Sequence, residues 1–137
     1  MAHMHLQNIL HRDIKPDNIF LSKNNVAKLG DFGVSRALSS SESFADTFCG
    51  TPFYMSPEVC GHELYGRKSD VWALGCSIYE IATLKRPFDH DDLQGLFRCI
   101  RDKEVNPLPE HVDPKIRMLV YSMLEKNPKL RPSIWDI

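Results

Sequence analysis

The most informative segment of the chain is His11-Arg12-Asp13-Ile14-Lys15-Pro16-Asp17-Asn18, and Asp31-Phe32-Gly33 begins thirteen residues after Asn18. Phosphoryl transfer requires a carboxylate that orients the attacking hydroxyl and oxygen ligands that hold Mg²⁺ against the transferring phosphate. Asp13 can supply the orienting carboxylate, and Asn18 and Asp31 can supply the metal ligands. Lys15 can place a cation near the transferred phosphate. Together the two motifs predict a site for phosphoryl transfer.

The same motifs resemble those of the protein kinases, whose catalytic loop reads H-R-D-x-x-x-x-N and whose metal-binding turn reads D-F-G. The resemblance implies an enzyme that uses ATP and Mg²⁺ and transfers the γ-phosphate to protein substrates. Lys15 fits the serine/threonine pattern, in which a cation at this position steadies the γ-phosphate. The implied catalytic residues are Asp13, Lys15 and Thr51, and the implied nucleotide-binding residues are Lys15, Asn18, Phe20 and Asp31.

The composition of the chain limits which binding partners and which cellular compartment are expected. The chain has 17 basic and 18 acidic residues, a formal net charge of −1. Without a basic excess, nucleic acid and anionic membranes are not expected as partners, and no apolar run reaches the length of a membrane span. The four cysteines show no CxxC spacing, which favours free thiols in a reducing compartment. We therefore expect a cytoplasmic or nuclear location, and the sequence leaves the oligomeric state open.

Apolar patterns predict a small hairpin followed by helices. Two short apolar runs, residues 19–21 and 26–29, are separated by polar residues, as in a hairpin. Residues 1–10 are expected to be the end of a helix that runs into the catalytic loop. From about Gly66 the chain is expected to be helical, and residues 71–82 leave almost no polar face, so this helix should be buried on all sides.

Two later helices show the one-sided spacing i, i+3, i+4, i+7 of a surface-packed helix. The apolar positions are Leu93, Leu96, Phe97 and Ile100 in the first and Ile116, Leu119, Val120, Met123 and Leu124 in the second. Asp113 is expected to cap the second helix, Pro114 to begin its first turn, and Asn127-Pro128 to end it.

A tiny hairpin followed by helices resembles the larger lobe of a protein kinase. The expected fold class is mainly α, an α+β protein-kinase-like fold: a C-terminal helical lobe with a small β-hairpin at the catalytic loop, and with the N-terminal lobe missing. The resemblance covers residues 1–137 as a partial kinase domain. It divides them into a catalytic loop (11–18), an activation segment (31–58) and a helical subdomain (59–137).

The segments with which kinases clamp ATP are not found in the sequence. Ten residues precede His11, and there is no G-x-G-x-x-G loop, no lysine in a V-A-I-K context and no helix offering its paired glutamate. The chain also stops inside what resembles the opening of the last helix, so either a truncated sequence or a natural half-kinase is expected. Because the clamp contacts are lost, we expect negligible kinase activity and at best weak nucleotide binding from the isolated chain.

The resemblance also implies residues that support the site. Phe32 is implied to pack on His11, which makes His11 a core histidine rather than an acid–base catalyst, and Phe20 to form the floor under the adenine. Asp70 is implied to accept backbone N–H bonds from the loop around His11 and Arg12. The alternative for Asp70 is an ordinary acid at a helix N-terminus, favoured by the helix dipole.

The candidate activation segment ends in Gly50-Thr51-Pro52-Phe53-Tyr54-Met55-Ser56-Pro57-Glu58, where the usual A-P-E reads S-P-E. Thr51 is implied to form hydrogen bonds near Asp13 and Lys15. Glu58 is implied to pair with Arg131, a link that is costly to break if it is buried. The alternative is a pair of exposed charges that contribute almost nothing.

A regulatory role is expected for Thr47. The resemblance to the NIMA-related kinases, whose motifs are given below, aligns Thr47 with a residue that those kinases phosphorylate. A phosphate on Thr47 would accept charge-assisted hydrogen bonds from Arg12 and Arg36. This would order the activation segment against Asp13. The alternative is that residues 39–47 are a solvated polar loop. The second-choice phosphorylation sites are Ser41 and Ser43.

Within the protein kinases, the residues of four segments most resemble those of the NIMA-related kinases. The segments that carry it are Asp17-Asn18-Ile19-Phe20-Leu21, Lys28-Leu29-Gly30-Asp31-Phe32-Gly33, Gly50 to Glu58 as quoted above, and Asp70-Val71-Trp72-Ala73-Leu74-Gly75-Cys76. Phe20 and the S-P-E ending discriminate best, whereas Phe53 departs from a position where tyrosine is common. Members of this family act in mitotic entry, centrosomes and cilia, which adds a cytoskeletal or centrosomal location to the expectations.

The sequence is compatible with two functions other than that of a serine/threonine kinase. One is a truncated, non-catalytic kinase-lobe module that binds protein partners through its helical face. The other is a small-molecule phosphotransferase of kinase-like fold, which also uses an Asp-to-Asn loop. The Thr51-Pro52 loop and the S-P-E ending argue against the second of these, because the kinase family uses both for peptide docking.

Overall fold

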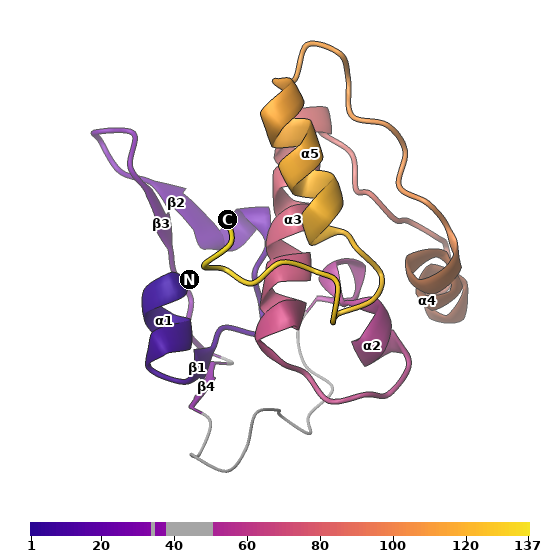
Figure 1. Cartoon of the computed structure of the whole chain (residues 1–137), viewed down its shortest axis with the longest axis horizontal. Helices are drawn as coiled ribbons and strands as arrows, with labels where there is room; N and C mark the ends of the chain where they lie inside the picture. The colour runs from indigo at the N-terminus through magenta and orange to yellow at the C-terminus, as the bar shows by residue number, and fades with distance from the viewer. Residues whose placement is uncertain (34, 38–50) are drawn as a thin grey trace.

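The computed structural model describes residues 1–33, 35–37 and 51–137, and Figure 1 shows their arrangement. The helices and strands in chain order are α1 (Ala2–Leu6), β1 (Ile9–Leu10), η1 (Pro16–Asn18), β2 (Ile19–Leu21), β3 (Ala27–Leu29), β4 (Arg36–Ala37), η2 (Pro52–Tyr54), α2 (Pro57–Cys60), α3 (Arg67–Thr83), α4 (Leu93–Asp102) and α5 (Pro114–Met123). The described chain is therefore mainly helical, with two small antiparallel sheets. This confirms the helix-rich, mixed class expected from the sequence.

The two sheets are both two-stranded. Strand β2 pairs with β3, with Phe20 opposite Lys28, so the predicted hairpin is confirmed, and it projects from the rest of the chain in Figure 1. The pairing of β1 with β4, in which Leu10 lies opposite Arg36, was not predicted. Strands of two residues are too short to show the period-2 alternation by which strands are recognised in a sequence.

The expectation of a continuous helix into the catalytic loop is wrong. Helix α1 ends at Leu6, and Asn8 then adopts a left-handed conformation with φ of 56°. Asparagine tolerates this region better than most residues. The chain therefore turns and reaches His11 as a strand, and this strand leads directly into the catalytic loop.

Helix α3 is the centre of the fold, and α5 lies along it in Figure 1. It begins after Gly66, whose N–H donates to the Ser69 hydroxyl at 3.2 Å. At Gly75 a Cβ would lie 2.7 Å from the Cβ of Met123, so the close approach of α3 and α5 requires glycine at this position. Trp72 is fully buried in the core that this approach creates.

The prediction that α3 is buried on all sides is correct for its first half and wrong at its end. Val71, Trp72 and Cys76 are buried, but the side chain of Ile81 is 55% exposed while Tyr79 is buried. The described residues therefore cover the last turn on only part of its circumference. Apolar content alone could not indicate this, because it does not say which elements pack against a given turn.

Helices α4 and α5 begin at side-chain caps. Asp92 accepts the N–H of Gly95 at 2.8 Å, and the predicted cap at Asp113 is confirmed by its bond from the N–H of Lys115 at 2.7 Å. Helix α5 ends at Met123, earlier than the predicted stop at Asn127-Pro128.

The predicted apolar stripes of α4 and α5 are buried only in part. The buried members are Leu96, Ile100, Val120, Met123 and Leu124, and the exposed ones, which belong to the first turns, are Leu93 and Ile116. Cys60, Cys76 and Cys99 are buried free thiols in the described part of the chain. None of the described helices combines the length and apolar character that crossing a bilayer would demand.

Candidate active site

The catalytic loop is fixed to helix α3 by Asp70. The backbone N–H groups of His11 and Arg12 donate to the two carboxylate oxygens of Asp70, each at 3.0 Å. Asp70 is fully buried, and Arg12 has a left-handed φ of 73°. The contacts implied for Asp70 are thus present, so this residue does more than favour the helix dipole. The loop that carries Asp13 is held in an uncommon backbone conformation by a buried carboxylate.

Two further donors to Asp70 were missed in the sequence. The Tyr65 hydroxyl lies 2.7 Å from Asp70 Oδ1, and His5 Nε2 lies 2.8 Å from Oδ2. Both partners are buried. His5 is 65 residues from Asp70, and no spacing or motif could have joined them. Together the four contacts provide hydrogen-bond partners for both Asp70 oxygens, as a buried polar group requires.

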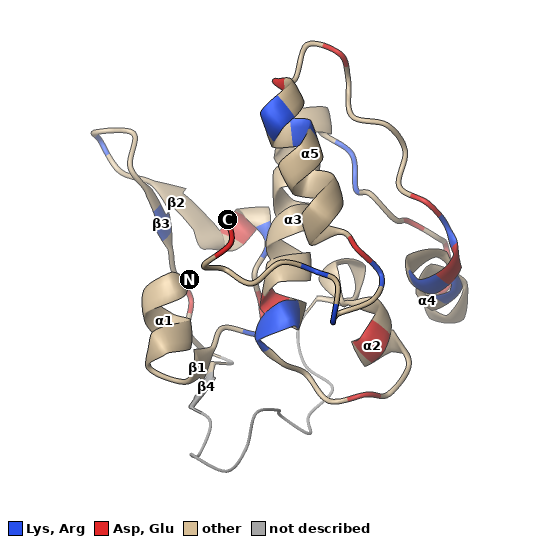
Figure 2. Ribbon diagram, in the orientation of Figure 1, with Lys and Arg blue, Asp and Glu red and all other residues tan. Residues whose placement is uncertain are grey.

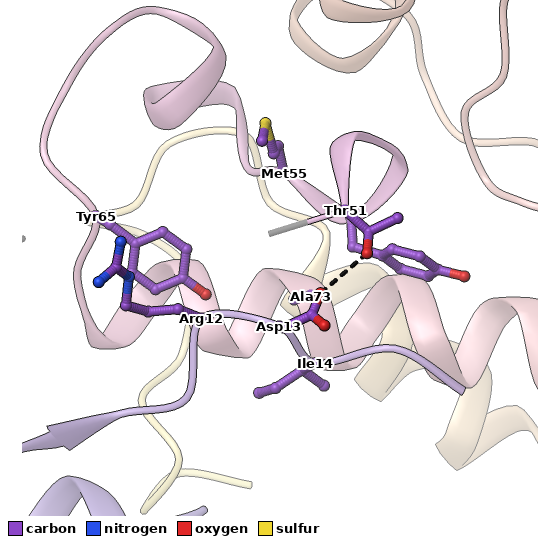
Figure 3. A pocket seen from close by; sticks show the side chains of 8 residues that line it. Arg12, Asp13, Ile14, Thr51, Met55, Tyr65 and Ala73 are labelled. Carbon is purple, nitrogen blue, oxygen red and sulfur yellow. Dashed lines mark hydrogen bonds between the residues drawn. The ribbon is translucent and has the colours of Figure 1, made fainter. Parts of the chain in front are cut away.

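The residues predicted to be catalytic lie together around Asp13. Thr51 Oγ1 donates to Asp13 Oδ1 at 2.9 Å, the bond drawn in Figure 3, and Lys15 Nζ lies 2.7 Å from Asp13 Oδ2. Lys15 also donates to Thr51 at 3.1 Å, and Asn18 Nδ2 donates to Asp13 Oδ2 at 3.1 Å. Three side chains from two distant segments therefore converge on the Asp13 carboxylate.

These contacts keep Asp13 ionised. Partial burial alone would raise the pKa of Asp13, but the hydrogen bonds from Lys15 and Thr51, with the charge of Lys15, outweigh it and lower the pKa below its ordinary value. An ionised carboxylate has about four lone-pair sites for hydrogen bonds. Thr51 occupies one on Oδ1, and Lys15 and Asn18 occupy two on Oδ2. The bonds from these three side chains leave an acceptor site on Oδ1 that a further hydroxyl could use.

A small pocket lies beside Asp13 and Thr51. Arg12, Asp13, Thr51 and Tyr65 are among the residues that line it, and Figure 3 shows their side chains. Its free space is about 10 Å³, close to what one water molecule needs. This pocket is therefore too small to hold a nucleotide, which would have to bind elsewhere around Asp13.

The two predicted metal ligands differ in how they are held. Asn18 is buried, and its Nδ2 also donates to the backbone oxygen of Asp13 at 2.7 Å, which leaves its Oδ1 for another interaction. Asp31 is exposed, has a left-handed φ of 58°, and accepts the Gly33 N–H at 3.2 Å. In the described residues no group of three or more His, Cys, Asp or Glu side chains could hold a metal by itself. A cation bound by Asn18 and Asp31 would need further ligands, such as phosphate oxygens.

The aromatic residues implied for the site lie as follows. The rings of His11 and Phe32 are 5.2 Å apart, and His11 Nε2 lies 3.0 Å from the backbone oxygen of Gly30. His11 is fully buried, so it is a packed histidine. Phe20 is half-exposed, and its ring lies where a Cβ on Gly30 would meet it at 2.8 Å. An exposed aromatic face at this position is compatible with the predicted adenine floor, a role that stays a prediction.

The end of the candidate activation segment is tied to the C-terminal part of the chain. Arg131 forms a bidentate pair with Glu58, with N–O distances of 2.8 and 2.9 Å, and both residues are buried. Ser69 of α3 donates to the same carboxylate at 2.9 Å, a contact that the sequence did not suggest. Burial opposes ionisation of Glu58, but the Arg131 guanidinium more than offsets it and lowers the pKa of Glu58. The alternative of two exposed charges is excluded.

The residues implied in regulation are only partly described. Thr47, Ser41 and Ser43 lie outside the described residues, and the side chain of Arg36 does as well. Arg12 is buried beside Asp13. The phosphorylation switch therefore remains a prediction.

Comparison with known proteins assigns the family. The protein kinase domain matches residues 1–137. The chain belongs to the protein kinase domain family. It is 46% identical over its whole length to the human serine/threonine-protein kinase Nek5, and 43% identical over its whole length to Nek1 of the mouse. It is 47% identical over 90% of its length to the G2-specific protein kinase nimA of Emericella nidulans. The resemblance to NIMA-related kinases is confirmed. The chain spans 20%, 11% and 18% of these relatives, respectively.

Proposed function

We propose that this chain is the catalytic-loop-bearing lobe of a protein serine/threonine kinase, which transfers the γ-phosphate of ATP to Ser or Thr of protein substrates. The observation that carries the proposal is the Asp13 carboxylate. Its pKa is lowered, it is fixed by Thr51, Lys15 and Asn18, and these described contacts leave an acceptor site on Oδ1. The family membership and the serine/threonine kinase names of its relatives support it.

In this proposal each residue around Asp13 has a separate task. Asp13 accepts the hydrogen bond of the substrate hydroxyl at its open site and orients the oxygen for attack. Lys15, held between Asp13 and Thr51, places a positive charge where negative charge develops. Thr51 fixes the carboxylate and forms the edge of the surface on which the peptide lies. Their mutual contacts already hold these side chains together around Asp13.

The residues present fit a Mg²⁺·nucleotide complex. Asn18 offers a neutral oxygen and Asp31 a charged one, the ligand types that Mg²⁺ takes alongside phosphate oxygens. When bound, ATP·Mg²⁺ supplies the γ-phosphoryl group and the charge neutralisation of the phosphates. Asn18 can serve as a ligand without losing its contacts to Asp13, since these use its Nδ2 atom. Phe20 offers its exposed ring to the adenine base.

The subdivision of the chain follows from the same proposal. Residues 11–18 act as the catalytic loop, residues 31–58 as the activation segment, and residues 59–137 as the helical lobe that supports both. The 137 residues contain no G-x-G-x-x-G loop and no V-A-I-K lysine. We therefore propose that these residues alone bind nucleotide weakly and do not turn it over. A non-catalytic module that binds protein partners is the alternative.

The test compares the purified natural protein that contains this chain with the 137-residue polypeptide. Both are given radiolabelled ATP, Mg²⁺ and matched peptides that differ only in having Ser, Thr or Tyr as the acceptor. We expect the protein to label the Ser and Thr peptides, with loss of labelling in the Asp31→Ala variant, and the polypeptide to label none. Labelling of Tyr alone, or no labelling by the protein, would contradict the proposal and favour the binding module. Rapid turnover by the polypeptide would refute its proposed inactivity.

A further inference from the structure

Arg86 is an exposed cation near the candidate active site, and it has no part in the chemistry proposed above. The guanidinium carbon of Arg86 lies 3.7 Å from the centroid of the Phe53 ring. Phe53 belongs to η2 and follows Thr51 by two residues, so their Cα atoms are at most ~7 Å apart. Arg86 follows the end of α3 by three residues. The contact therefore joins the loop after α3 to the segment that ends in the active site.

The backbone around Arg86 is fixed on both sides. Leu84 adopts a left-handed conformation with φ of 56° and ends α3, and the Lys85 N–H donates to the Thr83 hydroxyl at 3.2 Å. After Arg86, Pro87 and Phe88 are buried, and Phe88 stacks on Trp72 with ring centroids 5.7 Å apart. Arg86 therefore extends from a short loop that is anchored to the core at both ends, and its position does not depend on a mobile segment.

Stacking also fixes the guanidinium itself. A cation this close to an aromatic ring is attracted by the ring's quadrupole. The stacked face is occupied, but the N–H donors lie at the edge of the planar group, where they can form paired hydrogen bonds to an anion. Arg86 is exposed whereas Phe53 is half-buried. The donors are thus presented at the surface beside Phe53, two residues after Thr51.

The Glu80 carboxylate and the Arg86 guanidinium both lie close to the Tyr54 hydroxyl, and they shift the pKa of Tyr54 in opposite directions. Glu80 accepts the hydroxyl of Tyr54 at 2.7 Å and is half-buried, whereas Arg86 is exposed. Tyr54 is also one of the residues that line the pocket with Asp13 and Thr51. Because Arg86 is exposed and Glu80 is half-buried, an anionic side chain that approaches from solvent meets the Arg86 donors first.

We propose that Arg86, stacked on Phe53, is a specificity-determining residue that selects protein substrates with an anionic side chain close to the acceptor Ser or Thr. This inference rests on the proposed kinase function and adds the substrate class. Because the ring under Arg86 belongs to Phe53, two residues after Thr51, the subsite is within reach of a peptide residue a few positions from the acceptor. Carboxylates of Asp and Glu and the phosphate of a phosphoserine share the required chemistry.

The test uses the natural protein that contains this chain and a peptide with one serine and uncharged flanks. Gln, Glu, phosphoserine or Lys is placed at each flanking position in turn, and kcat/KM is measured for each peptide. We expect Glu to exceed Gln about threefold to tenfold at one flanking position, a range set by a charge-assisted bond at an exposed site. A larger increase in kcat/KM with phosphoserine than with Glu would show that the preferred anion is the phosphate of a substrate that is already phosphorylated.

Variants of Arg86 test whether this side chain causes the preference for an anionic residue in the peptide. Arg86→Gln should bring kcat/KM for the Glu peptide down to that for the Gln peptide, and Arg86→Glu should reverse the preference towards Lys. Lys85→Gln removes the adjacent exposed charge and should leave the preference intact. Equal kcat/KM for Glu and Gln peptides at every position, or a preference that survives Arg86→Gln, would overturn the inference while leaving the kinase activity standing. No transfer to any peptide would overturn the proposed function and this subsite with it.

Discussion

The Thr51 hydroxyl donates a hydrogen bond to the Asp13 carboxylate at 2.9 Å, although 38 residues separate the two in the sequence. Lys15 donates to the same hydroxyl oxygen, so Thr51 connects the cation and the carboxylate. The candidate activation segment therefore reaches the catalytic loop through one side chain. A change in the placement of this segment acts directly on the group that is proposed to orient the substrate.

Replacing Thr51 by valine, which has nearly the same shape but no hydroxyl, should lower kcat about tenfold or more. The reason is that one hydrogen bond to a charged group, worth roughly 1.5–3 kcal/mol, is lost where the acceptor hydroxyl is positioned. Steady-state kinetics of the natural protein with a Ser peptide measure this. Thr51→Ser restores the hydroxyl and should recover most of kcat. Equal kcat values for Thr51→Val and Thr51→Ser would show that the hydroxyl has no role.

Asp70→Ala should destabilise the fold strongly and disorganise the catalytic loop. The change leaves the N–H groups of His11 and Arg12 and the hydroxyl of Tyr65 without the acceptor that they share in the core. Unsatisfied buried groups of this kind cost about 1–3 kcal/mol each. Denaturant unfolding of the natural protein provides the measurement. The matched control is Asp113→Ala, an exposed helix cap, which should cost much less; a similar loss for both variants would contradict the account.

The pH dependence of stability should depend on Glu58. The pKa of Glu58 is lowered in the folded chain, mainly by Arg131 acting against burial, so the folded state favours the ionised form. This stabilisation is complete above the ordinary pKa of 4.5 and is lost as the pH falls through the lower folded pKa. Glu58→Gln should therefore reduce stability near neutral pH and flatten its decline in acid. Thermal unfolding measured between neutral and acidic pH tests this. If the loss of stability in acid were the same in Glu58→Gln as in the unchanged protein, other carboxylates would determine it.

The sequence predicted the parts of the structure in which neighbouring residues carry the information. The hairpin of β2 and β3, the start of α3 and the cap at Asp113 follow from local apolar patterns and capping chemistry, and the structure has them. The position of Asp13 beside Lys15 follows from two residues of separation in one motif. The contact between Thr51 and Asp13 came from the family resemblance, because nothing in the residues between them fixes a distance.

The features that the sequence missed depend on contacts between distant segments. His5 and Tyr65 complete the donors to Asp70, and Ser69 joins the pair of Glu58 with Arg131. These partners are single polar residues without a motif, and only the packing of α1, α2 and α3 brings them together. The exposed end of α3 at Ile81 was missed for the same reason, since burial depends on neighbours that a periodic pattern does not specify.

The central claim is that Asp13 orients the acceptor hydroxyl, and Asp13→Asn in the natural protein tests it most directly. The amide keeps the shape but cannot accept the same bonds, so kcat should fall at least about 100-fold, the lower range for loss of a positioned acid–base group. ATP·Mg²⁺ affinity measured by calorimetry should stay close to that of the unchanged protein, because the loss is confined to the transition state. Asp17→Asn, at an exposed neighbouring carboxylate, is the control and should leave kcat unchanged. An Asp13→Asn protein that retained most of its kcat would contradict the account.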